Sequence, residues 1–165
     1  MRTLGIDVGT RIAGYSVIEV TNGKLKPIIY GAIKVSPKLS FPERLKIIYD
    51  GLDNIIHEYK PANVAVEEIF FGKNIKSAIK VGEGRGIAIL CAAKANLPVA
   101  EYAATVVKKS VTGIGNATKM QVQEMVKNIL NISELPKLTD TSDAMAIAIC
   151  HCHRTMHEIN YKNYL

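Results

Sequence analysis

The stretch Leu4-Gly5-Ile6-Asp7-Val8-Gly9-Thr10, near the N-terminus, decides how the rest of the chain is interpreted. Residues 3–8 have the pattern of a short apolar strand, and the Gly9-Thr10 pair after it predicts a turn. Asp7 stands near the end of this strand, where a buried carboxylate is costly unless it is paired or bound to a metal. Asp7 is therefore a candidate functional residue, although Asp-Val-Gly also occurs in simple turns.

Outward from this strand, the pattern predicts an α/β fold. Strand-like segments at 12–20 and 25–35 follow across turn signals, which indicates an antiparallel meander. A capping box at Ser40–Glu43 begins a helix with apolar residues at helical spacing up to Tyr59. The remaining predicted elements are strands at 64–67 and 99–102 and helices at 74–96, 118–130 and 139 to about 156. A strand–helix–strand order implies parallel pairing through a right-handed crossover, so we expect a mixed sheet with helices on its faces.

The composition fits one globular domain. The chain has 165 residues, of which 48% are hydrophobic and 22% charged, and this excludes a disordered chain. The net charge of +6 lies wholly in residues 73–127, which hold nine Lys or Arg and three Glu. A polyanionic partner would explain this charge, and a basic surface kept for solubility is the alternative. Three cysteines, no secretory signal and no membrane-spanning run predict free thiols in a cytoplasmic protein with no membrane partner.

Two further segments place carboxylates at the ends of predicted elements. Glu67 and Glu68 close a predicted strand, and Asp140 and Asp143 begin the last helix at a spacing that lets both point to one place. Acidic residues in a first helical turn also complement the helix dipole, so this pair is weak evidence alone. With Asp7, however, three separate segments supply oxygen ligands of the kind that Mg²⁺ and Mn²⁺ prefer. Two such ions about 4 Å apart suit phosphodiester hydrolysis.

Four motifs resemble those of the RuvC Holliday-junction resolvases: LGIDVGTRIAGY at 4–15, AVEEIF at 65–70, KSVTGIGNATK at 109–119 and DTSDAMAIAICHCH at 140–153. The resemblance runs from about residue 2 to 154. It implies an RNase H-like fold with a mixed five-stranded sheet, and we expect one nuclease domain at 1–158 with a short tail at 159–165. It also implies a homodimeric, Mg²⁺-dependent endonuclease that resolves four-way DNA junctions by symmetric paired nicks in homologous recombination and DNA repair.

Matched residue by residue, the resemblance also implies site residues. The catalytic and metal-binding tetrad would be Asp7, Glu67, Asp140 and Asp143. It would hold two Mg²⁺ ions per subunit, with Mn²⁺ as a substitute, and Glu68 would lie outside it. Lys108 and Lys119 fall on basic positions beside the active site, and Lys119 could offset charge in the transition state. Phe70 falls on a position credited with base stacking. The family's usual partners are the RuvA–RuvB branch-migration proteins.

A basic stripe adjoins the aromatic pair Phe70-Phe71. Lys73, Lys76 and Lys80 lie at i, i+3 and i+7, so a helix would place them on one face, where they could contact DNA phosphates. A solvated helix face is the alternative. We expect Phe70 to face DNA and Phe71 to pack in the core.

Two other motifs are less specific. The Gly82-x-Gly84-x-Gly86 sequence lies inside a predicted helix, where small residues allow another helix to approach closely. This fits a dimer interface and ordinary packing within the chain equally well. Residues 150–153, Cys-His-Cys-His, do not predict a zinc site, because consecutive helical residues point in different directions.

Three other functions compete with the nuclease prediction. The GIDVGT sequence at 5–10 also occurs in ATP-binding proteins of the actin, sugar-kinase and Hsp70 type. That architecture needs two such domains, each about the length of this chain. An RNase H-like nuclease that acts on RNA is the second rival. A non-catalytic junction-binding protein is the third, but it has no need of converging carboxylates.

Overall fold

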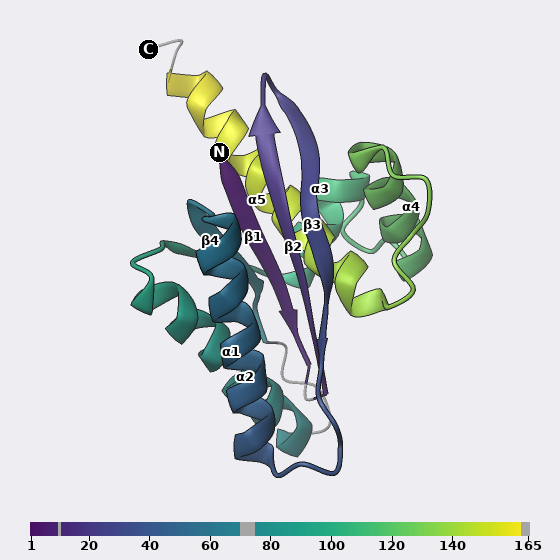
Figure 1. Ribbon diagram of the computed structural model, residues 1–165. Helices are drawn as coiled ribbons and strands as arrows, with labels where there is room; N and C mark the ends of the chain where they lie inside the picture. The colour runs from purple at the N-terminus through teal and green to yellow at the C-terminus, as the bar shows by residue number, and fades with distance from the viewer. Residues whose placement is uncertain (10, 70–74, 163–165) are drawn as a thin grey trace.

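The computed structural model describes residues 1–9, 11–69 and 75–162 (Figure 1). Its elements are β1 (Arg2–Val8), β2 (Ile12–Thr21), β3 (Lys24–Lys34), α1 (Phe41–Tyr59), β4 (Asn63–Glu67), α2 (Ile75–Lys94), β5 (Val99–Tyr102), α3 (Ala104–Thr112), α4 (Lys119–Leu130) and α5 (Thr139–Lys162). The five strands form one sheet in the order β3-β2-β1-β4-β5. β1, β2 and β3 pair antiparallel, whereas β4 pairs parallel with β1 and β5 pairs parallel with β4. The predicted meander and the mixed sheet are therefore confirmed.

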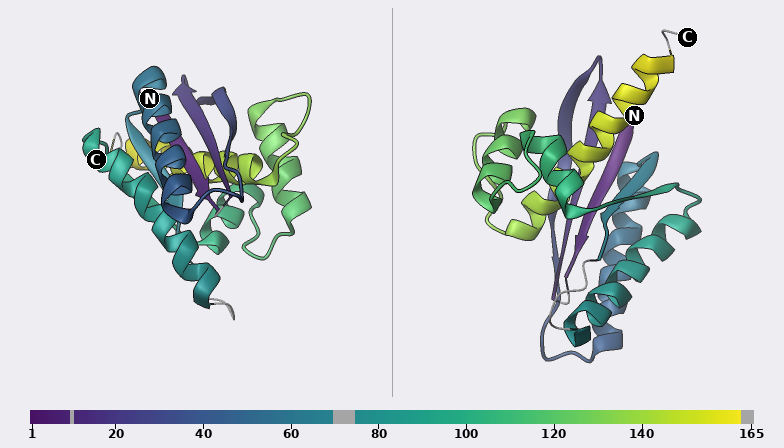
Figure 2. Two further views of the ribbon diagram at one scale, coloured as in Figure 1. Left: turned by 60° about the horizontal axis from the view of Figure 1, so that its bottom comes forward. Right: turned by 180° about the vertical axis from the view of Figure 1, so that it is seen from behind.

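Helices cover both faces of this sheet (Figure 2). Helix α5 crosses one face with α3 and α4 beside it, and α1 and α2 pack together on the other face. In β1, the side chains of Leu4, Ile6 and Val8 belong to the core on the α1 and α2 side. Because side chains alternate along a strand, Gly5 and Asp7 face α5.

Two glycines allow α5 to lie directly on the backbone of the sheet. A Cβ atom at Gly5 would overlap the carbonyl oxygen of Ala144, and one at Gly14 would overlap the carbonyl oxygen of Asp140. Both neighbouring atoms are backbone, so they cannot move aside as a flexible side chain can. Glycine at these two positions therefore sets how closely α5 approaches β1 and β2, and Gly14 lies beneath its first turn.

The structure corrects two of the predicted elements. Helix α3 was not predicted, because the β-branched run Thr105-Val106-Val107 has low helix propensity and Ala103 supplies no side-chain cap. Helix α5 continues to Lys162, whereas the pattern placed its end near residue 156. The capping box is confirmed, since the backbone N–H of Ser40 donates to Glu43 at 2.8 Å and Glu43 stands at N3 of α1.

Two further observations bear on the setting of the chain. All three cysteines are buried and none forms a disulfide, which confirms the prediction of free thiols. Among the helices of the described residues, none has both the length and the apolar character needed to cross a membrane.

The close approach over Gly14 gives the first prediction. Gly14→Ala should lower the free energy of unfolding by about 2 kcal/mol or more, because the new methyl group must push the start of α5 off β2. Urea denaturation measures this change. Gly115→Ala is the matched control, because its Cβ would lie 3.5 Å from the Thr105 carbonyl oxygen, an ordinary contact. Equal destabilisation by the two substitutions would contradict the packing described here.

Candidate active site

Asp7 and Glu67 lie at neighbouring strand ends. Asp7 is the sixth residue of β1 and Glu67 is the last residue of β4. Ile6 pairs with Val66 in the parallel register, so Asp7 and Glu67 occupy the next position on each strand. The alternation that turns Val66 toward α1 and α2 turns Glu67, like Asp7, toward the face that α5 covers.

The first two turns of α5 bring Asp140 and Asp143 to the same edge of the sheet. Gly14 pairs with Asp7 across β1 and β2, and the Asp140 carbonyl lies directly over Gly14. A Cβ atom at Gly9 would lie 3.8 Å from Oδ1 of Asp140, so this carboxylate stands beside the end of β1. Sequence reasoning gave Gly9 and Gly14 no structural role in the site. The only available signal was their place in the motif that contains Asp7.

The four carboxylates interact electrostatically. Burial, followed by the negative charges of Asp143, Glu67 and Asp140, raises the pKa of Asp7 from 3.8 to about 7. Burial and then the charge of Asp143 also raise the pKa of Glu67, against the opposing effect of Lys108 and Lys119. The structure thus brings together all four residues of the predicted tetrad, in surroundings that disfavour full ionisation.

Lys119 is the cation in direct contact with this cluster. Its Nζ donates to Oδ2 of Asp143 at 2.7 Å. Burial lowers the pKa of Lys119, but the hydrogen bond to Asp143 and the charges of Asp143, Asp7 and Asp140 raise it overall. Lys119 stands at the first position of α4, directly after the N-cap Thr118, whose hydroxyl accepts from the backbone N–H of Gln121. The capped end of α4 therefore holds the base of this lysine in place.

A cavity of about 270 Å³ opens beside these groups. Its polar lining residues are Glu67, Asp143, Lys108 and Lys119, and its apolar ones are Ala104, Val107, Val122 and Ala146. Sequence reasoning missed the apolar wall, since half of it comes from the unpredicted helix α3. Charged groups over an apolar wall interact more strongly than they would in bulk water.

The other predicted DNA-binding residues lie outside this cavity. Lys76 and Lys80 are exposed on α2, and the Lys80 ammonium lies 5.9 Å from the centre of the Phe41 ring. Phe70 and Lys73, together with the neighbouring Phe71, lie outside the described residues, so the stripe beside the aromatic pair stays a prediction. Glu68 is exposed.

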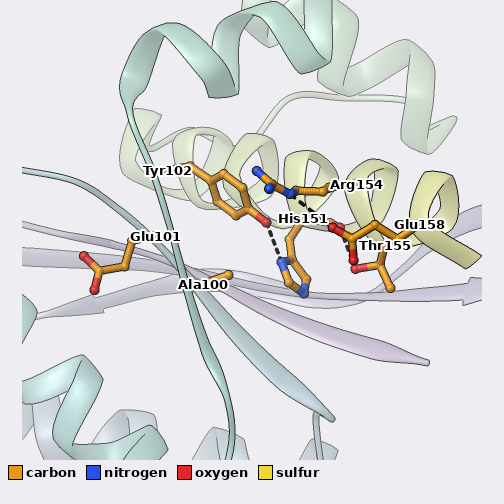
Figure 3. Close-up of a pocket in the computed structure, with 7 residues that line it drawn as sticks. All are labelled: Ala100, Glu101, Tyr102, His151, Arg154, Thr155 and Glu158. Atoms are coloured by element: carbon orange, nitrogen blue, oxygen red, sulfur yellow. Dashed lines mark hydrogen bonds and ion pairs between the residues drawn. The ribbon is translucent and has the colours of Figure 1, made fainter.

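A second pocket, of about 330 Å³, lies between β5 and the second half of α5 (Figure 3). The Tyr102 hydroxyl lies 2.7 Å from Nδ1 of His151, and Nε of Arg154 lies 3.3 Å from Oε1 of Glu158. None of the predicted site residues lines it. His151 belongs to the Cys-His-Cys-His segment, and its ring bonds to a tyrosine rather than joining a metal-ligand set.

Metal binding by the four carboxylates rests on their charge and their chemistry. Within residues 1–9, 11–69 and 75–162, no three His, Cys, Asp or Glu side chains are grouped as a ready-made ligand set for one ion. The cluster does consist of hard oxygen donors, which Mg²⁺ and Mn²⁺ prefer. The raised pKa values of Asp7 and Glu67 show that the lysines leave part of its negative charge unbalanced. A divalent cation fits this donor set.

The pKa of Asp7 predicts how stability depends on pH without metal. In the unfolded chain Asp7 ionises near pH 3.8, but in the folded protein it ionises near pH 7, so ionisation opposes folding increasingly as the pH rises between these values. In EDTA, Asp7→Asn should raise the free energy of unfolding by about 2–4 kcal/mol at pH 8. Near pH 4 the gain should vanish. Urea denaturation at both pH values measures it, and an equal gain at each would contradict the buried, repelled carboxylate.

Comparisons with known proteins agree with this arrangement. The family model described as crossover junction endodeoxyribonuclease RuvC matches residues 3–151. The chain is 50% identical over 153 residues, 93% of each protein, to a crossover junction endodeoxyribonuclease RuvC from Caldanaerobacter subterraneus subsp. tengcongensis. The structure of Thermus thermophilus RuvC is similar with a TM-score of 0.88 and 33% identity, covering 96% of this chain and 97% of that one. This match confirms the predicted RNase H-like fold class.

A second solved structure, of T. thermophilus RuvC in complex with a Holliday junction substrate, gives a TM-score of 0.89 and 34% identity and covers 94% of each chain. Sequence, fold and the four converging carboxylates therefore agree. The chain belongs to the RuvC family of crossover junction endodeoxyribonucleases.

Proposed function

We propose that this chain cuts four-way (Holliday) DNA junctions by paired, symmetric nicks, as a step in homologous recombination and DNA repair. The observation that carries the proposal is the convergence of four carboxylates from β1, β4 and α5 beside Lys119 in a chain of this family. The related T. thermophilus RuvC was solved with a Holliday junction substrate, which supports the choice of DNA. RuvA–RuvB proteins would be partners, by family resemblance.

The metal site would consist of Asp7, Glu67, Asp140 and Asp143, with two Mg²⁺ ions per subunit and Mn²⁺ as a substitute. When bound, such ions lower the pKa of an attacking water and stabilise the leaving oxygen of a phosphodiester. Binding them would also offset the repulsion that raises the pKa of Asp7, so metal binding and ionisation of the cluster support each other.

The remaining residues of the cavity would act on the phosphate directly. Lys119 holds Oδ2 of Asp143 and presents positive charge at the cavity, where it would stabilise the extra negative charge of the transition state. Lys108 lines the same cavity, where it would contact a second phosphate oxygen. Val107 and Val122 keep the cavity wall apolar, which strengthens both interactions.

DNA would extend from this cavity over the basic third of the chain. Residues 73–127 hold all of the excess positive charge, and this region includes the exposed Lys76 and Lys80. Lys73 would join them in phosphate contacts, and Phe70 would stack on a base near the junction centre. Residues 1–158 would form the nuclease domain, with 159–165 as a tail.

A mobile four-way junction incubated with the protein and Mg²⁺ tests the activity. The wild type should make paired nicks on opposed strands, whereas Asp7→Asn should cut at least about a thousandfold more slowly, because it removes a ligand carboxylate at the cluster's centre. Junction binding by Asp7→Asn, measured in Ca²⁺, should persist.

Asp50→Asn is the control, because Asp50 is an exposed carboxylate of α1 paired with Lys46, and this variant should cut like the wild type. An RNA–DNA hybrid that outcompetes the junction would favour the RNA-directed alternative. Normal cutting by Asp7→Asn would refute the metal site.

Helix α2 offers the surface for a homodimer. Its exposed apolar side chains are Ile75, Ile79 and Leu90, which are 64%, 53% and 49% exposed. A Cβ atom at Gly86 would meet nothing within 4 Å. These four positions lie within about 60° of one another around the helix, so they form one stripe along which a second copy of α2 could pack closely. A symmetric dimer would place two active sites for two nicks.

Leu90→Glu tests this interface. A charge in the stripe should make the protein monomeric at micromolar concentration in sedimentation equilibrium, whereas the wild type should be a dimer. Ile47→Glu on α1, where Ile47 is 39% exposed, is the control and should remain dimeric. A monomeric wild type would contradict the homodimer, and a dimeric Leu90→Glu would place the interface elsewhere.

A further inference from the structure

Arg85 of α2 joins the ends of two strands from the face of the sheet opposite α5. Its Nε donates to the backbone carbonyl of Glu67 at 3.0 Å, and its Nη2 forms an ion pair with Oε2 of Glu101 on β5. The Arg85 side chain is only 18% exposed. In Figure 3 the Glu101 carboxylate points away from Tyr102 and His151, as the alternation along β5 requires.

The peptide group between Glu67 and Glu68 is held at both of its polar atoms. Its carbonyl oxygen accepts from Arg85, and the N–H of Glu68 donates to the carbonyl of Tyr102 at 2.9 Å. Residues before Glu67 are held by pairing with β1 and β5. Because the direction of a carbonyl reflects the backbone rotation at its own residue, the Arg85 contact fixes the last backbone rotation that orients Glu67.

Helix α2 also contacts the end of the strand that carries Asp7. A Cβ atom at Gly84 would lie 2.8 Å from Cγ1 of Val8, and one at Gly82 would lie 3.1 Å from Cδ1 of Ile69. The helix therefore packs closely behind both strand ends, and Arg85 supplies the polar contact between them. Gly82, Gly84 and Gly86 thus divide their roles, since the first two face the chain's own strands and the third faces outward.

Arg85 acts on the backbone of Glu67 rather than on the charge of its carboxylate. The charges that shift the pKa of Glu67 are those of Asp143, Lys108 and Lys119, after burial, and Arg85 is not among them. The negative neighbours of Glu67 push its carboxylate away from the cluster. A rigid strand end is what opposes that displacement.

We propose that Arg85 is a positioning residue for the nuclease reaction, which holds Glu67 in the carboxylate cluster by fixing its carbonyl and tying it to Glu101 of β5. The inference rests on the proposed role of Glu67 as a metal ligand. It also makes α2, the helix with the exposed stripe, the element that supports the active site from behind.

The chain contains a matched control for Arg85. Nε of Arg2 pairs with Glu19 at 3.0 Å and its Nη1 donates to the carbonyl of Tyr59 at 2.9 Å, so it makes the same two kinds of contact at the start of β1. Arg85→Gln and Arg2→Gln each lose one carboxylate and one carbonyl partner. Only the first loss lies behind the carboxylate cluster.

The test compares single-turnover nicking of a four-way junction, junction affinity in Ca²⁺, melting temperature, and Mn²⁺ binding without DNA by electron paramagnetic resonance. Arg85→Gln should nick roughly 10- to 100-fold more slowly and bind Mn²⁺ more weakly, because a ligand displaced by about 1 Å impairs catalysis to this extent. Its junction affinity should match the wild type. Arg2→Gln should lower the melting temperature comparably while keeping nicking and Mn²⁺ binding.

Two further variants keep the outcomes separable. Arg85→Lys retains one donor and the charge, so its nicking rate should lie between those of the wild type and Arg85→Gln, and it serves if Arg85→Gln does not fold. Nicking and Mn²⁺ binding in Arg85→Gln or Arg85→Lys no weaker than in Arg2→Gln would overturn the inference. So would a parallel loss of nicking, junction affinity and stability. Glu67→Gln tests the proposed function itself, since normal nicking by that variant would refute the role of Glu67 whatever Arg85 does.

Discussion

The contact between α5 and the bare backbone of β1 and β2 is the constraint on which the site depends. Gly5 and Gly14 leave no side chain between helix and sheet, so the first turns of α5 reach the strand end that carries Asp7. This approach brings like charges together, and the pKa of Asp7 rises to about 7 as a result. The fold therefore spends stability on charge convergence, an expense that packing elsewhere must balance.

The two faces of the sheet have separate tasks because side chains alternate along each strand. On one face, Val64 and Val66 of β4 join the core under α1 and α2. On the other face, Glu67 and Asp7 meet α3, α4 and α5, whose residues line the cavity. The apolar core under α1 and α2 thus gives the strand ends a rigid base, which a group of mutually repelling carboxylates requires.

The sequence allowed a good prediction of the carboxylates and a poor one of what surrounds them. Asp7 could be recognised because a charged residue in an apolar strand breaks a strong local pattern, and the Ser40 capping box is likewise local. Helix α3 opposes its own β-branched composition, so it and the Val107 wall were missed. The overlap of Gly14 with Asp140 and the bond from Arg85 to a backbone carbonyl depend on distant segments meeting, and no spacing rule reveals them.

The basic third of the chain solves an electrostatic problem that the acidic cluster creates. A polyanion approaching four carboxylates would be repelled, and positive net charge spread over the whole surface would weaken that repulsion little within the cavity, where short-range terms dominate. Lys108 and Lys119 come from the basic region 73–127, yet both line the cavity, and Lys119 is hydrogen bonded to the cluster itself. The other exposed lysines, such as Lys76 and Lys80, lie outside the cavity and remain available to phosphates farther along a duplex. The excess charge therefore has two parts: a local part that lets DNA approach the carboxylates, and a distributed part that holds the DNA there.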